Sequence, residues 1–200
     1  MSLDLPWWAS LKHGGLFLSA PRLADLFTAS TPPLAPYVVA RLRGDLQRLD
    51  ENPADSAASK ALLDTVLHDI AGLRDSANTD WQRGNDVQPR FTRRAASGEM
   101  VKPRRVWTGP NGALLPVFVD DEPRLGIGRG KRSVSRVIEW CRGTGHPLAL
   151  LTNTRQFRLL HVAAEHDAYC EWDTAQWFEA GLPSAQVEAW QQLLSPALHT

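Results

Sequence analysis

The sequence predicts an α/β (α+β) fold, in which an N-terminal helical segment, residues 1–80, precedes a mixed sheet flanked by helices, residues 81–200. Three observations lead to this prediction. Apolar residues recur at helical spacing over residues 62–73, short apolar runs bounded by turn residues follow residue 104, and a helical stripe separates two of those runs. A chain of 200 residues, 43% of them hydrophobic, is long enough to bury a core.

Three helices are expected in the N-terminal segment. Ser19 and Pro21 suit the N-cap and the first turn of a short helix, and a second helix is expected from Tyr37 to Leu49. The third helix carries the clearest apolar stripe, which is formed by Leu62, Leu63, Val66, Leu67, Ile70 and Leu73.

The second segment opens with a polar, irregular stretch, residues 82–103, which predicts a long loop or a weakly formed strand. Residues 104–108 and 113–119 flank the turn GPNG and predict a β-hairpin. Because proline cannot donate a hydrogen bond to a sheet, Pro116 predicts a bulge or a sheet edge in the second strand.

A helix, strands and a final helix are expected to complete the second segment. Ser133 or Ser135 is the predicted N-cap of the helix, and Gly143 is its predicted C-terminal stop. Ser184 is expected to open the final helix. The strands are predicted from residues 148–152, 157–162 and 167–172.

Composition excludes several classes of protein. No apolar run is long enough to span a bilayer, and the N-terminus lacks the basic and apolar regions of a signal peptide. Cys141 and Cys170 form neither a ligand pair nor a disulfide framework, which is typical of a reducing compartment. The sequence therefore predicts a soluble, cytoplasmic protein with no membrane partner.

The charge is unevenly distributed although the chain is neutral overall. Residues 83–136 contain 12 Lys and Arg against five acids, a local charge of +7, and no Lys or Arg follows Arg158. A basic centre of this kind indicates a polyanion such as DNA, a contact with the acidic end of the chain, or only a solvated surface. The candidate DNA-phosphate contacts are Arg129, Lys131, Arg132 and Arg136, with Arg155 as an outer candidate.

The loop GIGRGKRS, residues 126–133, does not fit a nucleotide-binding motif. A phosphate-binding P-loop needs Ser or Thr directly after Gly-Lys, where this chain has Arg132, and the even spacing of Gly126, Gly128 and Gly130 does not match the dinucleotide pattern. A more general anion site remains, with backbone amides and a helix N-terminus expected at about residue 134.

Three consecutive acids, Asp120, Asp121 and Glu122, end the second hairpin strand and are weak candidates for a catalytic metal site. Nucleases of the PD-(D/E)XK type hold Mg²⁺ with an acid on the first hairpin strand and an acid-x-Lys triplet on the second. Here the first strand has no acid, and the triplet is Glu122-Pro123-Arg124. The sequence thus predicts no metal or cofactor, and acids that are exposed or paired with arginines such as Arg124 or Arg129.

Several segments resemble the N-terminal region of type IIG restriction–modification methylases and related phage-defence DNA methyltransferases. LALLTNTRQFRLLH, residues 148–161, is similar to their "LTNG-x-x-W/F-x-L" strand–turn–strand, with Thr154 at the usual glycine, and GGLFLSAPRLADLF, residues 14–27, resembles their opening segment. The resemblance implies a restriction-endonuclease-like fold, which some members of that family keep without its catalytic acids. An Asn-Pro-Pro-Tyr-like methyltransferase loop is absent, because TPPLAPY lacks the asparagine.

The leading hypothesis is a non-catalytic, nuclease-like module of a bacterial restriction–modification or phage-defence methylase. Its expected partners are DNA and a methylase domain or subunit of the same system. One alternative is an active Mg²⁺-dependent endonuclease that uses Asp120, Asp121 or Glu122 with Glu99 or Asp86 from the preceding loop. Another is a pure protein–protein interaction module that docks its acidic end, residues 165–188, on a basic partner.

Overall fold

The computed structural model describes residues 5–27 and 31–196, and the chain forms two compact units. The helical unit comprises Met1–Leu11, Ala20–Arg74 and Thr174–Thr200, and the sheet unit comprises Lys12–Ser19 and Asp75–Asp173. The predicted class, a mixed α/β fold with helices near the N-terminus, is confirmed. The two units divide between Arg74 and Asp75 and again between Asp173 and Thr174, so that residues 174–200 group with the helices.

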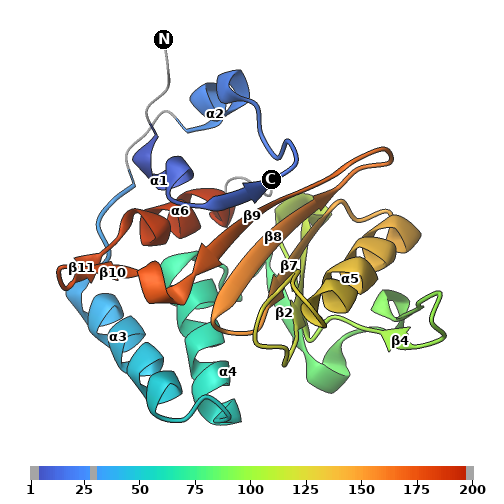
Figure 1. Cartoon of the computed structure of the whole chain (residues 1–200), viewed down its shortest axis with the longest axis horizontal. Helices are drawn as coiled ribbons and strands as arrows, with labels where there is room; N and C mark the ends of the chain where they lie inside the picture. The colour runs from blue at the N-terminus through green and yellow to red at the C-terminus, as the bar shows by residue number, and fades with distance from the viewer. Residues whose placement is uncertain (1–4, 28–30, 197–200) are drawn as a thin grey trace. The chain divides into compact units, whose positions relative to one another are not determined.

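The helical unit contains the three expected N-terminal helices and the final one (Figure 1). All six residues of the predicted apolar stripe are buried. Asp55 caps the third expected helix by accepting hydrogen bonds from the amides of Ala57 and Ala58. The elements of this unit are α1 (Pro6–Ala9), α2 (Ala20–Leu26), α3 (Pro36–Glu51), α4 (Ser56–Asp64), the π-helix η1 (Thr65–Ile70), the 3₁₀ turn η5 (Thr174–Gln176), β10 (Phe178–Glu179), β11 (Leu182–Pro183) and α6 (Ala185–Leu193).

Tryptophan and a buried acid tie these helices together. The indole of Trp190 on α6 is fully buried and donates to the carbonyl oxygen of Val66 on η1 at 2.7 Å. Asp45 on α3 is also buried, and it accepts from the hydroxyl of Thr65 at 2.6 Å and pairs with Arg48. The bond from Trp190 explains why the C-terminal helix belongs to the helical unit, since it joins α6 to a residue more than 120 positions earlier.

The sheet unit is built on a seven-stranded sheet with the order β1-β9-β8-β7-β6-β5-β2. Only β6 and β7 pair in parallel, because α5 (Gly130–Thr144) connects them as a crossover, and α5 packs against β7 and β8 (Figure 1). The strands are β1 (Lys12–Gly14), β2 (Asp80–Arg83), β5 (Arg105–Thr108), β6 (Leu114–Val119), β7 (Leu148–Thr152), β8 (Gln156–Val162) and β9 (Asp167–Asp173). The small elements are η2 (Gly84–Asp86), η3 (Pro89–Phe91), η4 (Pro110–Gly112), and the paired strands β3 (Arg93–Arg94) and β4 (Met100–Val101).

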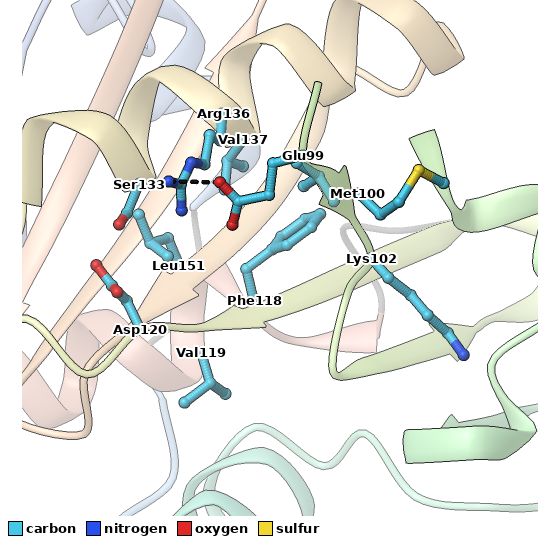
Figure 2. Close-up of a pocket in the computed structure, with 11 residues that line it drawn as sticks. Glu99, Met100, Lys102, Phe118, Val119, Asp120, Ser133, Arg136, Val137 and Leu151 are labelled. Carbon is cyan, nitrogen blue, oxygen red and sulfur yellow. Dashed lines mark ion pairs between the residues drawn. The ribbon is translucent and has the colours of Figure 1, made fainter. Parts of the chain in front are cut away.

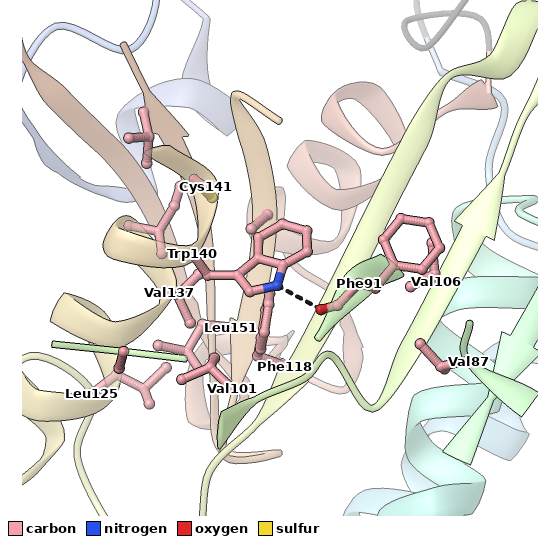
Figure 3. Close-up of a cluster of buried hydrophobic side chains, with 14 residues drawn as sticks. Val87, Phe91, Val101, Val106, Phe118, Leu125, Val137, Trp140, Cys141 and Leu151 are labelled. Atoms are coloured by element: carbon pink, nitrogen blue, oxygen red, sulfur yellow. Dashed lines mark hydrogen bonds between the residues drawn. The ribbon is translucent and has the colours of Figure 1, made fainter. Parts of the chain in front are cut away.

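One buried apolar cluster joins α5, the sheet and the segment before β5 (Figure 3). Trp140 on α5 is at its centre, with its ring 5.2 Å from that of Phe118 on β6 in an edge-to-face arrangement. Its indole N–H donates to the carbonyl oxygen of Phe91 at 2.7 Å, so the polar atom of this side chain is satisfied (Figure 3). Residues 82–103, predicted as a long loop or a weak strand, contain the end of β2 and the short elements η2, η3, β3 and β4, and this hydrogen bond joins the segment to α5 at Phe91.

Three local predictions are wrong. Pro116 lies neither at a sheet edge nor in a bulge: it is opposite Val106 in the interior strand β6, directly before the residues that pair with β7. Helix α5 begins at Gly130, not after Ser133 or Ser135. It ends at Thr144, because Gly145 rather than Gly143 adopts the left-handed conformation and donates to the carbonyl oxygen of Cys141.

Within residues 5–27 and 31–196, no helix is both long enough and apolar enough to cross a membrane.

Candidate nucleic-acid interface

The predicted phosphate contacts lie on and beside residues 122–129, here called the basic loop, which connects β6 to α5. Hydrogen bonds from the β7–β8 turn and from the first residues of β8 hold its backbone. Asn153 donates to the carbonyl oxygen of Glu122 at 2.8 Å, and Gln156 accepts from the amide of Leu125 at 2.9 Å. Arg158 donates to the carbonyl oxygen of Leu125 at 3.2 Å. The backbone of the basic loop is therefore held in place by hydrogen bonds and is not an unsupported loop.

The evenly spaced glycines of the basic loop are required by its geometry. Gly126 and Gly128 adopt φ angles of +71° and +57°, in the left-handed region that favours glycine. A Cβ at Gly126 would clash with the guanidinium group of Arg158, and one at Gly130 would clash with the carbonyl oxygen of Arg124. The glycines of GIGRGKRS, which do not fit a nucleotide-binding motif, thus form a tight loop that packs against the buried Arg158.

That arginine belongs to a buried ion pair. Arg158 on β8 and Glu171 on β9 are 5% and 4% exposed at their side chains, and two guanidinium nitrogens of Arg158 bind one carboxylate oxygen. The Arg158 guanidinium also lies over the ring of Tyr169, 4.1 Å from its centroid. Lys12 on β1 donates to the other carboxylate oxygen of Glu171 at 3.3 Å. The pair links the two strands and the basic loop through one guanidinium group.

The turn that clamps the loop contains Thr154, at the position where the resembled pattern has glycine. Its φ angle is +67°, which a β-branched residue rarely adopts. Asn153 stabilises this turn by accepting, through its side-chain oxygen, from the amides of Arg155 and Gln156 at 3.1 and 2.7 Å. Glycine would adopt this backbone conformation without strain.

The structure brings four of the five predicted phosphate contacts together at the start of α5. Arg129 is the residue before the helix, Lys131 and Arg132 are in its first turn, and all three are exposed. Arg136, one turn further, is half-buried and forms an ion pair with Glu99 at 2.6 Å. Arg155 is also half-buried and lies in the β7–β8 turn.

Two further cations lie beside α5, and sequence reasoning did not single them out. Arg93 and Arg94 form β3, and they line a hollow of about 100 Å³ together with Arg136 and Glu139 of α5. The pKa of His146 is lowered, first by burial and then by the positive charges of Arg90 and Arg93. Only the local charge count of the sequence could have indicated these two arginines, because they approach α5 through tertiary packing.

The three acids directly follow the last residue of β6. Asp121 is exposed, whereas Asp120 and Glu122 are half-buried, and no ion pair joins any of these described acids to Arg124 or Arg129. Asp120 lines a cavity of about 180 Å³ (Figure 2). One oxygen of Asp120 accepts from the amide of Asp121 at 3.0 Å, and the other is buried without a hydrogen-bond partner in the described part of the chain.

The same cavity is also lined by Glu99, Lys102 and Ser133 (Figure 2). Figure 2 shows the carboxylate of Glu99 directed at Arg136, in the ion pair already described, while the Lys102 ammonium group points away from Asp120. Glu122 and Asp86 are not in the lining. Across residues 5–27 and 31–196, no three His, Cys, Asp or Glu side chains are grouped so that they could hold a metal ion.

The chain matches no protein-family model, no curated protein and no solved structure. The resemblance to the methylases therefore rests on the sequence motifs alone.

Proposed function

We propose that this protein is a non-catalytic DNA-binding module of a bacterial restriction–modification or phage-defence methylase, which contacts the DNA backbone through the start of α5 and the basic loop. The observation that carries this proposal is the arrangement of Arg129, Lys131 and Arg132. All three cations are exposed at the N-terminus of one helix, and no acid is present in its first turn.

This arrangement is unfavourable for an isolated protein and favourable for one that binds an anion. The N-terminus of a helix already carries a partial positive charge, so cations there destabilise the helix. A phosphate group reverses the balance, because both the helix and the side chains attract it. The whole sheet unit has the matching sign: 16 Lys and Arg against 12 Asp and Glu, whereas the helical unit has six against 10.

The clamp on the basic loop supports the same function. Binding is weakened by the entropy that is lost when a mobile segment becomes ordered, and a loop already held by Asn153, Gln156 and Arg158 loses less. All three side chains belong to the motif that resembles the methylases. In this proposal the motif acts through the loop that it holds, and the methylase domain or subunit of the same system supplies the methyl transfer.

The test is DNA binding by the double variant Lys131→Glu/Arg132→Glu, measured by fluorescence anisotropy with a labelled duplex between about 50 and 200 mM salt. Each lost phosphate contact lowers the slope of log K against log salt concentration by about 0.9, so we expect a slope smaller by about 2 and much weaker binding. The control is Arg22→Glu/Lys60→Glu, which makes the same charge change at exposed positions of the helical unit. Equal losses in both variants, or no binding by the parent chain at low salt, would contradict the proposal.

A Mg²⁺-dependent endonuclease is the second candidate, and the cavity beside β6 favours it. Asp120, Glu99 and Lys102 all line this cavity, and they are the residue types that such enzymes use. Against this candidate, Glu99 is bound to Arg136, and Glu122 lies outside the cavity. Two carboxylates, one of them neutralised by a guanidinium group, are a weak site for a divalent cation.

The interaction module is less well supported. Its acidic end, residues 165–188, is partly neutralised within the chain, because Asp167 pairs with Arg142 at 2.9 Å and Glu171 pairs with Arg158.

A further inference from the structure

Ile127, in the middle of the basic loop, is an apolar side chain that the fold holds in solvent. It is 51% exposed and lies between two glycines, and the exposed charged residues of the basic loop are Arg124 and Arg129. A single exposed apolar residue is ordinary on a protein surface. This one is unusual in its backbone, which is fixed on both sides.

The loop geometry leaves Ile127 little freedom to turn inward. Gly126 and Gly128 are both in the left-handed conformation, and the amide of Gly130 donates to the carbonyl oxygen of Ile127 at 3.1 Å. The amide of Gly126 in turn donates to the carbonyl oxygen of Gly130 at 3.1 Å. Beneath Gly126 lies the guanidinium group of Arg158, which fills the space that a side chain would need. The loop thus projects an isoleucine from a closed, supported turn.

An exposed apolar side chain on a supported turn, with the exposed cations Arg124 and Arg129 before and after it in the chain, matches one kind of DNA contact. Proteins that kink a duplex insert Ile, Leu, Met or Phe between two base pairs, and Lys and Arg on either side bind the phosphates of the opened step. Unstacking a base step costs free energy, and additional backbone contacts offset that cost. Arg129, Lys131 and Arg132 are placed to supply such contacts, because they follow Ile127 within five residues.

We propose that Ile127 is a wedge that inserts into a base step of double-stranded DNA and unstacks it. This inference rests on the proposed function and extends it, since it assigns to the basic loop a preference for DNA whose bases separate easily. Mismatched or flexible steps require less energy to unstack, so they should bind more tightly than a perfect duplex.

The experiment compares two labelled duplexes of the same length, one perfect and one with a single central mismatch flanked by 2-aminopurine. For the parent chain we expect about tenfold tighter binding to the mismatched duplex by anisotropy, and a rise in 2-aminopurine fluorescence on binding. Ile127→Ala should bind both duplexes equally, with no fluorescence rise, and Ile127→Met should retain the preference because methionine can also insert. Leu16→Ala, which removes another exposed apolar side chain of the sheet unit, serves as the control and should behave as the parent chain does.

The outcomes separate this inference from the proposed function. Salt-sensitive binding of both duplexes without a preference would overturn the wedge and leave backbone binding intact. A preference that survives in Ile127→Ala would also overturn it. No binding of either duplex at low salt would overturn both.

Discussion

At the scale of single residues, Thr154 shows how the sequence and the backbone conflict. The chain turns at this position with a φ angle of +67°, where a β-branched side chain is strained by about 1–2 kcal/mol relative to the right-handed region. Thr154 is nevertheless buried, and its hydroxyl donates to the carbonyl oxygen of Asn153 at 2.6 Å. These contacts offset part of the strain.

Replacing this threonine tests the balance. The quantity to measure is the free energy of unfolding, by urea denaturation. We expect Thr154→Gly to be more stable than the parent chain, and Thr154→Val to be less stable than the parent chain by about 1 kcal/mol or more. Glycine removes the strain but adds freedom to the unfolded chain, so its gain is expected to be less than about 1 kcal/mol. Valine keeps the branched Cβ and loses the hydroxyl. A glycine variant clearly less stable than the parent chain would mean that the threonine contacts outweigh the strain.

At the scale of elements, the sequence predicted those that depend on local patterns. The stripe from Leu62 to Leu73, the hairpin of β5 and β6 and the final helix after Ser184 were predicted because spacing and capping residues mark them. The start of α5 was predicted wrongly, because serine is a common N-cap residue and Ser133 and Ser135 follow the glycines. The helix begins earlier, at Gly130, where Gln156 and Arg158, about 30 residues later in the chain, hold the preceding loop.

The candidate interface was predictable to the same extent. Charge and order along the chain identified Arg129, Lys131, Arg132 and Arg136, which are contiguous with one helix. They could not identify Arg93 and Arg94, whose approach to α5 depends on the buried cluster around Trp140. The sequence also did not predict that the TNTRQFR segment holds the basic loop. It does so through hydrogen bonds to the loop backbone, which no local pattern indicates.

Strands β8 and β9 and the basic loop share one buried interaction, the ion pair between Arg158 and Glu171. We expect Arg158→Leu to lower the free energy of unfolding by about 3–5 kcal/mol, because it leaves the carboxylate of Glu171 buried with only weaker partners. The double variant Arg158→Leu/Glu171→Leu should recover most of this loss, since no charge is left buried. Arg142→Leu, which breaks the exposed pair with Asp167, should cost no more than about 1 kcal/mol. Equal losses in the single and double variants would show that the pair is not coupled.

At the scale of the whole molecule, the excess positive charge and the candidate functional residues belong to the sheet unit. Its net charge is +4 and that of the helical unit is −4, and the residues proposed to bind DNA all belong to the sheet unit. The cavity that contains Asp120 is in the same unit. Arg136, one of the candidate phosphate contacts, also lines this cavity, so the arrangement of the acids decides whether this unit binds DNA only or also cuts it.

Metal-dependent cleavage needs several oxygen ligands within 2.0–2.6 Å of one ion and a group that activates water. The described residues offer Asp120 and a Glu99 that is bound to Arg136, while Asp121 is exposed beyond the strand. We therefore expect the purified chain to leave supercoiled plasmid intact in Mg²⁺ or Mn²⁺, under conditions in which it binds the same DNA. Nicking that disappears in both Asp120→Asn and Glu99→Gln, while DNA binding and thermal stability are kept, would contradict this expectation and assign the cavity as a catalytic centre. Nicking that persists in both variants would instead indicate a contaminating nuclease, because neither candidate ligand would then be required.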